Sequence, residues 1–196
     1  MARMRSVVAG VTCVGAATLV GCKTGTPEPA TTAPSPAAVA AANDVMAADA
    51  TLRDATGAEV GTAELTSDDN GAVHLIVRVH GLPPGTHGIH FHALGVCDGA
   101  GAFASAGGHF NPRDQHHGLE NPAGPHAGDL PNLVVNADGT GTLDATTGRA
   151  TLRSGPATLF DADGTALVIH AGPDDQKSDP SGNSGARIAC GIVQGK

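Results

Sequence analysis

The alternation of side chains between residues 73 and 80 constrains the fold more than any other feature of the sequence. The apolar members are Val73, Leu75, Val77 and Val79, and the mostly polar residues between them are His74, Ile76, Arg78 and His80. A period of two is typical of a strand with one buried face. No segment shows a convincing helical period. The chain is therefore expected to fold from strands alone.

Further segments predict short strands and tight turns. Residues 50–65 indicate a hairpin around Thr56-Gly57, and residues 133–143 indicate another with Asp138-Gly139 as its turn. Apolar strands are expected at residues 86–93, 165–171 and 186–193. The 28 glycines and 13 prolines suit many short strands joined by turns and loops. We therefore predict an antiparallel Greek-key β-sandwich or barrel.

Two segments are too long for simple turns, residues 97–131 and residues 171–185. Structureless loops of this length inside a compact domain are usually functional or disordered. Both contain most of the histidines and acidic residues that suggest chemistry. The functional site is expected where these loops meet.

The N-terminal region predicts export. Residues 1–21 combine two arginines with a short apolar run, as a signal peptide does. The sequence LVGC, which ends at Cys22, resembles a bacterial lipobox whose cysteine becomes lipidated. Residues 22–44 are rich in Pro, Ala and Thr and predict an extended linker. We expect a membrane-anchored lipoprotein of the cell envelope or periplasm, with its folded domain at residues 45–196.

Charge limits the classes of partner. Removal of residues 1–21 takes away two of the eleven basic residues and none of the nineteen acidic ones, which leaves a formal charge of −10. No basic surface remains that could hold the phosphates of a nucleic acid. The charge therefore argues against nucleic acid as a partner.

The cysteines predict one disulfide. The signal peptide contains Cys13, and Cys22 is the expected site of lipidation, so Cys97 and Cys190 remain. An even pair in an exported chain indicates a disulfide. In the chain-entropy account, closing so long a loop stabilises the fold by about 4–5 kcal/mol.

Histidines gather in the long loops and at strand ends. His109, His117 and His126 are followed by Asp129, and three imidazoles with one carboxylate suit tetrahedral zinc. On a strand, His90 and His92 would share one face, with Phe91 pointing the other way. His170 ends an apolar strand and could add a further nitrogen to a set that suits Cu(II). Spacing alone does not choose between His116 and His117.

Several of these motifs together resemble the copper/zinc superoxide dismutases. GTHGIHFHALGVC, GGHFNP, the HHG histidines, GPHAGDL, ALVIHAG and GARIACGIV occur in that family's order and approximate spacing. The likeness covers about residues 45–193 and is strongest at 85–131 and 164–193. The resemblance implies a β-sandwich enzyme with copper and zinc as cofactors.

The resemblance also implies residue roles. Copper would be bound by His90, His92, His109 and His170, and zinc by His109, His117, His126 and Asp129, with His109 bridging both metals. The family's spacing from HFNP selects His117 over His116. Asp174 would join a copper ligand to a zinc ligand, as partners behind metal ligands commonly do. Arg187 and Ser181 would line the substrate channel, and Lys177 would assist in steering the substrate.

The implied reaction converts two superoxide anions into dioxygen and hydrogen peroxide. Copper would alternate between Cu(II) and Cu(I), while zinc, which has no second redox state, would hold the loop. In the family mechanism, His109 would carry a proton to the forming peroxide. Two alternatives remain open: a copper/zinc-binding protein that stores or delivers metal without turnover, and a copper-only enzyme, against which the predicted zinc ligands argue. A homodimer is possible, and the sequence does not decide it.

Overall fold

A computed structural model describes residues 46–196, and the predicted signal peptide, Cys22 and linker lie outside the described residues. Within that part, the fold consists of strands and one short 3₁₀ helix. In chain order the elements are β1 (Ala47–Asp54), β2 (Glu59–Ser67), β3 (Val73–Val79), β4 (Gly85–His87), β5 (Ile89–His92), η1 (Ala104–Ala106), β6 (Leu133–Val135), β7 (Gly141–Thr147), β8 (Ala166–His170), β9 (Arg187–Ile192) and β10 (Gln194–Gly195). None of the described helices has the length and apolar character needed to cross a membrane.

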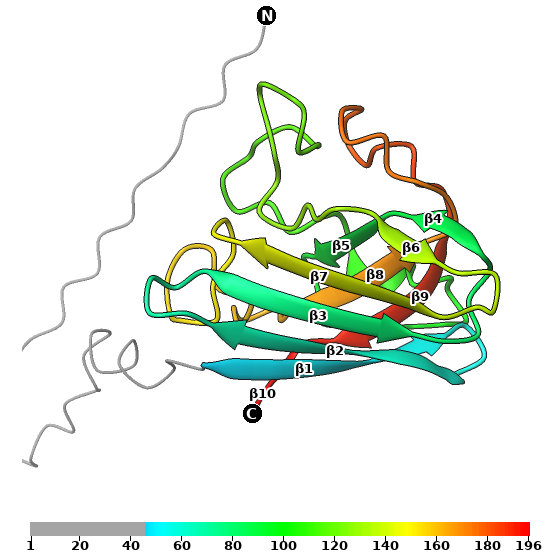
Figure 1. Cartoon of the computed structure of the whole chain (residues 1–196). Helices are drawn as coiled ribbons and strands as arrows, with labels where there is room; N and C mark the ends of the chain where they lie inside the picture. The colour runs from blue at the N-terminus through cyan, green and yellow to red at the C-terminus, as the bar shows by residue number, and fades with distance from the viewer. Residues whose placement is uncertain (1–45) are drawn as a thin grey trace, which may run out of the picture. The chain divides into compact units, whose positions relative to one another are not determined.

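The strands form one antiparallel sheet that curls into a nearly closed barrel (Figure 1). Its order is β4-β6-β7-β3-β2-β1-β9-β8-β5, and β10 pairs with β1. Strand β3 lies beside β7 in the sheet, whereas β4, which follows β3 in the chain, lies three places away beyond β7 and β6. This long connection across two intervening strands is the Greek-key arrangement. The predicted all-β Greek-key fold is confirmed.

Local sequence explains the first three strands. Asp54 Oδ1 accepts hydrogen bonds from the amides of Thr56 and Ala58, at 2.8 and 3.0 Å, which closes the turn between β1 and β2. Gly57 occupies this turn at φ 87°, a conformation that disfavours other residues. The alternation predicted for β3 is present, because its four apolar residues at 73, 75, 77 and 79 are buried.

Aliphatic side chains fill the barrel. Leu52, Leu75, Leu133 and Ile169 are fully buried, and Phe91 is the largest side chain among them. Burial of a Leu or Ile side chain stabilises a fold by about 1.5–3 kcal/mol. Phe91 points into this core, so its neighbours in β5 point to the opposite face. The core thereby sets the direction in which His90 and His92 face.

The strand predicted at residues 86–93 is interrupted at Gly88. The residues before it pair with β6, whereas those after it pair with β8, at the other end of the sheet. Gly88 itself donates to Gly172 O at 2.8 Å and accepts from His170 N at 2.8 Å. The chain therefore crosses the gap in the barrel at this residue, and a single strand could not serve both ends.

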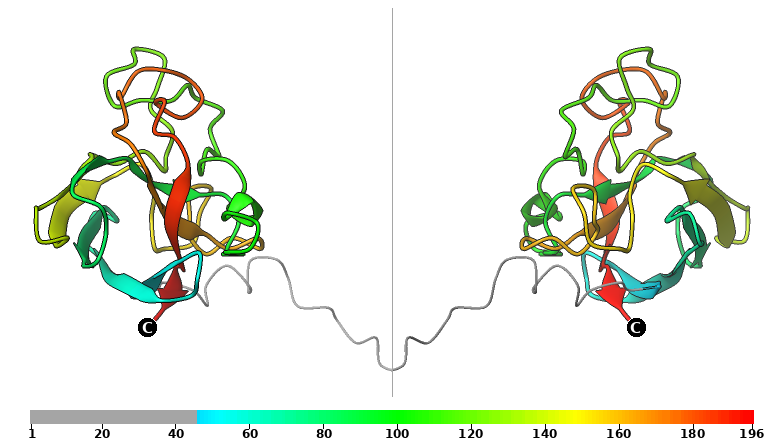
Figure 2. Two further views of the ribbon diagram at one scale, coloured as in Figure 1. Left: turned by 90° about the vertical axis from the view of Figure 1, so that its right-hand side faces the viewer. Right: turned by 90° about the vertical axis from the view of Figure 1, so that its left-hand side faces the viewer.

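The two predicted loops lie at the same end of the barrel, where the segment after β5 and the segment before β9 rise side by side (Figure 2). The first contains only η1, and the second contains no regular element. A third long connection, residues 148–165 between β7 and β8, is not evident from the sequence. Its alternating Ala and Leu residues, such as Ala150 and Leu152, are buried in the core, which is why it resembles a strand in sequence.

The predicted disulfide is confirmed between Cys97 and Cys190, which are 93 residues apart in the chain. Phe103 and Ala106 pack with Cys190 in a small second core beside the barrel. The disulfide and this core fix the start of the first loop to β9. Arg187 lies at the beginning of the same strand.

Candidate metal centre

Strand β5 ends the sheet, and the first loop covers its free edge. Phe91 N donates to Gly128 O at 2.9 Å, and Ala93 N donates to Gly108 O at 2.9 Å. The resulting antiparallel bridges place His109 opposite His92 and Asp129 opposite His90. Main-chain pairing, rather than side-chain contacts alone, therefore brings loop residues to the two strand histidines.

Gly128 permits this close approach. A Cβ atom at this position would overlap the carbonyl oxygen of Phe91 and lie 3.2 Å from the Cβ of Phe110. Only glycine leaves room for the loop to lie against β5. Asp129, the next residue, is thereby fixed beside the histidines.

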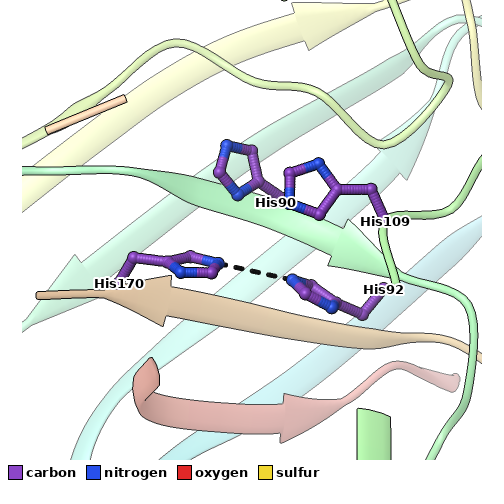
Figure 3. A group of neighbouring side chains, drawn as sticks. All are labelled: His90, His92, His109 and His170. Carbon is purple, nitrogen blue, oxygen red and sulfur yellow. Dashed lines mark hydrogen bonds between the residues drawn. The ribbon is translucent and has the colours of Figure 1, made fainter. Parts of the chain in front are cut away.

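Four imidazoles form the first group, from β5, β8 and the first loop (Figure 3). They are His90, His92, His109 and His170, and one ring nitrogen from each lies within 4.8 Å of the others. His92 Nε2 and His170 Nε2 face each other at 3.4 Å. Within the described residues, His90 Nδ1 and His109 Nε2 are buried without a hydrogen-bond partner. Buried nitrogens without partners fit a cation that they bind together.

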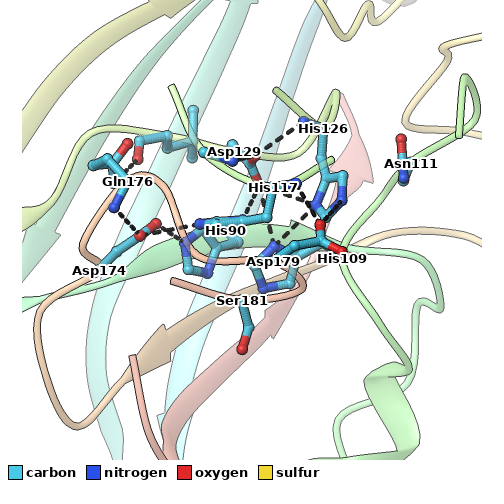
Figure 4. A network of polar contacts seen from close by, with 12 residues as sticks. His90, His109, Asn111, His117, His126, Asp129, Asp174, Gln176, Asp179 and Ser181 are labelled. Atoms are coloured by element: carbon cyan, nitrogen blue, oxygen red, sulfur yellow. Dashed lines mark hydrogen bonds and ion pairs between the residues drawn. The ribbon is translucent and has the colours of Figure 1, made fainter. Parts of the chain in front are cut away.

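The second group contains His109, His117, His126 and Asp129 (Figure 4). Asp129 Oδ1 lies 3.1, 3.0 and 3.3 Å from the Nδ1 atoms of the three histidines in that order, and the Nδ1 atoms of His109 and His126 are 3.4 Å apart. Tetrahedral zinc with ligands at about 2.0–2.1 Å requires neighbouring ligand atoms to be about 3.3 Å apart. The donor set therefore fits zinc in chemistry and in size.

Burial keeps the imidazoles of the first group unprotonated. Removal from water lowers the pKa of His90 to about 3, of His92 to about 2 and of His170 to about 4. The pKa of His109 is lowered for the same reason, although Asp129 opposes the shift. Neutral imidazole is the form that binds metal, so this group is ready for a cation at neutral pH.

In the metal-free state the second group favours a protonated imidazole, whereas the first group favours neutral ones. Burial disfavours the charged form of His117, but hydrogen bonds to Asp129 and Asp174 outweigh it and raise its pKa to about 9. Burial likewise disfavours ionised Asp129, yet hydrogen bonds from His109 and His117 hold its pKa well below the usual range. A positive charge is thus favoured here, as a proton or as a metal ion.

Asp174 joins the two groups from the second loop (Figure 4). Its Oδ2 lies 2.7 Å from His90 Nε2, and its Oδ1 lies 3.0 Å from His117 Nε2. All three side chains are buried. The resemblance implied this connecting position for Asp174, and its carboxylate lies between the two histidines.

A cleft of about 490 Å³ leads to the first group. Its lining includes His92, His109, Ser181 and Arg187, so the structure brings two of the three expected channel residues together. Lys177 does not line this cleft; its Nζ lies 2.9 Å from Glu120 Oε2, and both side chains are exposed.

Main-chain oxygens hold Arg187. Its Nη1 donates to Phe103 O at 2.6 Å, and its Nη2 donates to Gly107 O. Gly107 O also accepts from Nδ1 of His92 at 3.0 Å. Burial lowers the pKa of Arg187 from its ordinary value. The guanidinium nevertheless stays charged at neutral pH, because its ordinary pKa is so high.

Sequence reasoning missed several supporting residues. Asn132 exchanges two hydrogen bonds of 2.8 Å with the backbone of Asp174, and Arg149 Nη2 donates to Asp129 O at 2.8 Å. Asp179 Oδ1 accepts from His117 N at 2.6 Å and so ties the second loop to the first. These contacts involve the backbone of partners far away in the chain, so no spacing in the sequence indicates them.

Comparisons with known proteins agree with this geometry. The sequence model of the family described as copper/zinc superoxide dismutase (SODC) matches residues 59–193. Superoxide dismutase [Cu-Zn] 1 of Aquifex aeolicus (strain VF5) is 47% identical over 140 residues, which are 70% of this chain and 82% of that protein. Superoxide dismutase [Cu-Zn] of Caulobacter vibrioides is 39% identical over 150 residues, which are 75% and 85%.

A solved structure is also similar. The crystal structure of a SOD-like protein from Bacillus subtilis has a TM-score of 0.67 and 41% sequence identity, and the match covers 74% of this chain and 97% of that one. The match by the family's sequence model spans most of the barrel and both metal-binding groups. The chain therefore belongs to the copper/zinc superoxide dismutase family.

Proposed function

We propose that the chain dismutates superoxide at a histidine-bridged copper/zinc site in the cell envelope and thereby protects the cell against extracellular superoxide. Family membership makes it a copper/zinc superoxide dismutase, an oxidoreductase with these two metals as cofactors. The observation that carries the site assignment is that His109 belongs to both donor groups. The N-terminal sequence supports the location of the chain in the cell envelope, and the protective role follows from that location together with the reaction.

Each metal has its own set of residues, and the two sets share His109. His90, His92, His109 and His170 would hold copper, because an all-nitrogen set suits Cu(II). His109, His117, His126 and Asp129 would hold zinc. When bound, copper supplies the one-electron redox chemistry that dismutation requires. The residues around it bind the substrate, orient the imidazoles and handle the proton.

His109 is placed to move a proton. Its Nδ1 lies close to Asp129 Oδ1, whereas its buried Nε2 has no hydrogen-bond partner in the described chain. The ring stacks on that of His90 in the first group. We assign Nε2 as the atom that carries a proton from solvent to the reduced substrate when it is not engaged as a metal ligand. In the metal-free chain Asp129 Oδ1 orients the ring from its opposite nitrogen, Nδ1, and with zinc bound both atoms would be ligands of that ion.

Arg187 is assigned the task of attracting the anion. Its guanidinium lies at the cleft and is fixed by two carbonyl oxygens, so its charge is presented without a carboxylate partner in the described residues. A fixed cation beside a reactive site raises the encounter rate of an anionic substrate. Ser181 lines the same cleft as a small hydroxyl, and Lys177 is proposed only as a weak contributor because Glu120 neutralises it.

Metal analysis combined with a superoxide-decay assay tests the proposal. We expect one copper and one zinc per chain and catalysed decay that disappears on chelation. His109→Gln retains a polar side chain of similar length but removes the shared imidazole, so it should remove activity and lower the affinity for both metals. Copper and zinc bound without turnover would instead identify a metal storage or delivery protein. Activity with copper alone, unchanged by zinc removal, would contradict the paired site.

Location is tested separately. Fractionation of the native host with metabolic fatty-acid labelling should find the chain in the membrane fraction. Cys22→Ser should release it in soluble form. A labelled Cys22→Ser variant would contradict lipidation at that residue.

A further inference from the structure

The positive charges of the described chain are unevenly distributed. Four of the eight Lys and Arg side chains in residues 46–196 lie within 4.0 Å of a carboxylate oxygen: Arg53, Arg78, Lys177 and Lys196. The other four have no such partner among the described residues. One of them is Arg187 at the metal cleft. The remaining three, Arg113, Arg149 and Arg153, line a single pocket elsewhere.

This pocket, here called the arginine pocket, has a volume of about 500 Å³. It lies where the connection after β7 meets the β2–β3 turn, and Arg113 of the first loop completes it. Figure 1 shows that connection and that turn at the same end of β3 and β7. Its lining includes no acidic residue and shares no residue with the metal cleft. A basic pocket of this kind is unexpected on a chain with a net charge of −8.

The nearby carboxylates are engaged elsewhere. Asp68 Oδ1 accepts from the amides of Asn70 and Ala72 at 2.9 and 2.8 Å, so only the main-chain oxygen of Asp68 meets Arg153 Nη2, at 3.1 Å. Asp129 likewise offers Arg149 only its main-chain oxygen, because the histidines occupy its carboxylate. No carboxylate oxygen of the described residues lies within 4.0 Å of these arginines, although the negative charge of Asp129 favours the charged form of Arg149.

Two of the arginines have unused donors. The Nε atoms of Arg149 and Arg153 are buried without a hydrogen-bond partner among the described residues. A buried donor without a partner costs free energy, and such groups commonly mark a ligand position. Thr151, Ser154 and Asn70 add neutral polar side chains to the same lining.

We propose that the arginine pocket binds a phosphate group, either as the free ion or as a phosphate monoester. Three arginines from two segments of the chain suit a tetrahedral dianion, which accepts hydrogen bonds from several directions, better than a planar carboxylate. The bound phosphate would join Arg113 of the first loop to the connection after β7. Because Arg149 also holds the backbone of Asp129, this occupant would brace the zinc side of the metal centre.

Phosphate titration of the metal-loaded full chain tests the site, with binding read by calorimetry and by the thermal unfolding midpoint. Chloride at matched ionic strength serves as the reference. Phosphate could also enter the metal cleft, so the titration is made in the Arg187→Ala background. We expect saturable binding there and a rise in the unfolding temperature.

Substitutions in that background locate the bound ion. Arg113→Gln, which changes an exposed side chain, should weaken phosphate binding roughly tenfold, since it removes one charge-assisted contact. The double variant Arg113→Gln with Arg153→Gln should abolish it. Arg78→Gln is the matched control, because Arg78 is an exposed arginine outside the pocket, and it should leave the affinity unchanged.

Two results would overturn the proposal: loss of all saturable binding in the Arg187→Ala background, or affinity that Arg113→Gln leaves unchanged. Titration with sn-glycerol 3-phosphate distinguishes the sources. Tighter binding of this probe than of inorganic phosphate assigns a monoester to the pocket, and equal or weaker binding assigns the free ion. Neither readout depends on superoxide turnover, so failure of the pocket would leave the enzymatic assignment untouched.

Discussion

At the residue scale, one carbonyl oxygen serves both the proposed substrate guide and a proposed copper ligand. Gly107 O accepts from Arg187 Nη2 and from His92 Nδ1. The position of the guanidinium is therefore tied to the orientation of the imidazole. Asp174 similarly ties His90 to His117, so the two metal groups and the cleft form one connected set of polar contacts.

Replacement of Arg187 tests its role in attraction. Arg187→Ala should lower the second-order rate constant for superoxide about tenfold or more at low salt, because a fixed cation near the site raises encounter rates by factors of that order. Copper content should stay unchanged, since no side-chain atom of Arg187 belongs to the donor groups. Arg78→Ala is the control on the barrel wall. An unaltered rate for Arg187→Ala at low ionic strength would refute the guiding role.

The metal-free protein should be most stable near neutral pH. His90, His92 and His170 have pKa values lowered from 6.5 to about 3, 2 and 4. The free energy of unfolding therefore decreases as pH falls below about 6.5, because the unfolded chain takes up protons that the folded chain does not. His117 has its pKa raised to about 9. Its protonated form therefore adds fully to the free energy of unfolding below pH 6.5, and this stabilisation disappears between pH 6.5 and pH 9.

Urea unfolding midpoints of the chelator-treated protein between pH 5 and pH 9 measure this dependence. We expect a maximum between about pH 6 and pH 7.5. The metal-loaded protein is the control, because zinc replaces the proton on His117 and should remove the alkaline decline. A midpoint that rises steadily up to pH 9 would contradict the protonated state assigned to His117.

Candidate donor residues could be named from the sequence, with the family resemblance needed to prefer His117 over His116, whereas their supports could not. His90 and His92 stand two apart on a strand, and the histidines of the first loop have distinctive spacings. By contrast, Gly107, Asn132 and Arg149 act through main-chain oxygens or on main-chain groups far away in the sequence. Such contacts depend on how the loops fold back, and residue type does not reveal them.

At the element scale, the second loop packs closely against Asp174, the residue that joins the two donor groups. Gly182 lies at φ 62°, and a Cβ there would overlap Asp174 Oδ1 and lie 2.7 Å from His117 Nε2. A side chain would have to displace the carboxylate that orients both histidines. The shape of this loop therefore matters to metal binding even though no residue between 175 and 185 belongs to either donor group.

Gly182→Ala should accordingly weaken zinc binding about 10–100-fold, the range found when the partners of metal ligands are lost. Chelator competition measures the affinity. Gly81→Ala is a matched control, because Gly81 has a similar φ of 67° and a Cβ atom there would have no heavy atom within 4 Å. Equal effects of the two substitutions would show that backbone strain, rather than displacement of Asp174, is responsible.

The strands are easier to predict than their connections. Alternation identifies β3, and turn residues identify the hairpin of β1 and β2, because both signals are local. The interruption at Gly88 depends on pairing with two distant partners, β6 and β8, and leaves no local signal. The connection at residues 148–165 escapes prediction because its buried residues alternate as those of a strand do.

At the scale of the whole molecule, a fixed arginine lies in a cleft of an acidic chain. The chain has a formal charge of −8, which repels an anionic substrate, whereas Arg187 at the cleft is proposed to attract it. The sign of the salt dependence shows which dominates. We expect Arg187 to dominate at short range, because it lies beside His92, whereas Asp179 in the same cleft faces His117 and His126.

The second-order rate should therefore fall as ionic strength rises from about 0.01 to 0.15 M, over which the Debye length shortens from about 30 to about 8 Å. Pulse radiolysis at constant pH measures it. In Arg187→Ala the decline should flatten or reverse, since only the repulsive field remains. A rate that increases with salt in the unaltered protein would mean that net repulsion governs the approach.

The crossing at Gly88 also bears on the order in which the chain is made. Strand β5 closes the barrel against β8, and β8 in turn pairs with β9, which ends at Ile192, four residues before the C-terminus. A partly synthesised chain holds His90, His92 and His109 before it holds β8, which carries His170, or β9, which pairs with β8. The four imidazoles of the first group can therefore come together only after β8 and β9 have been made.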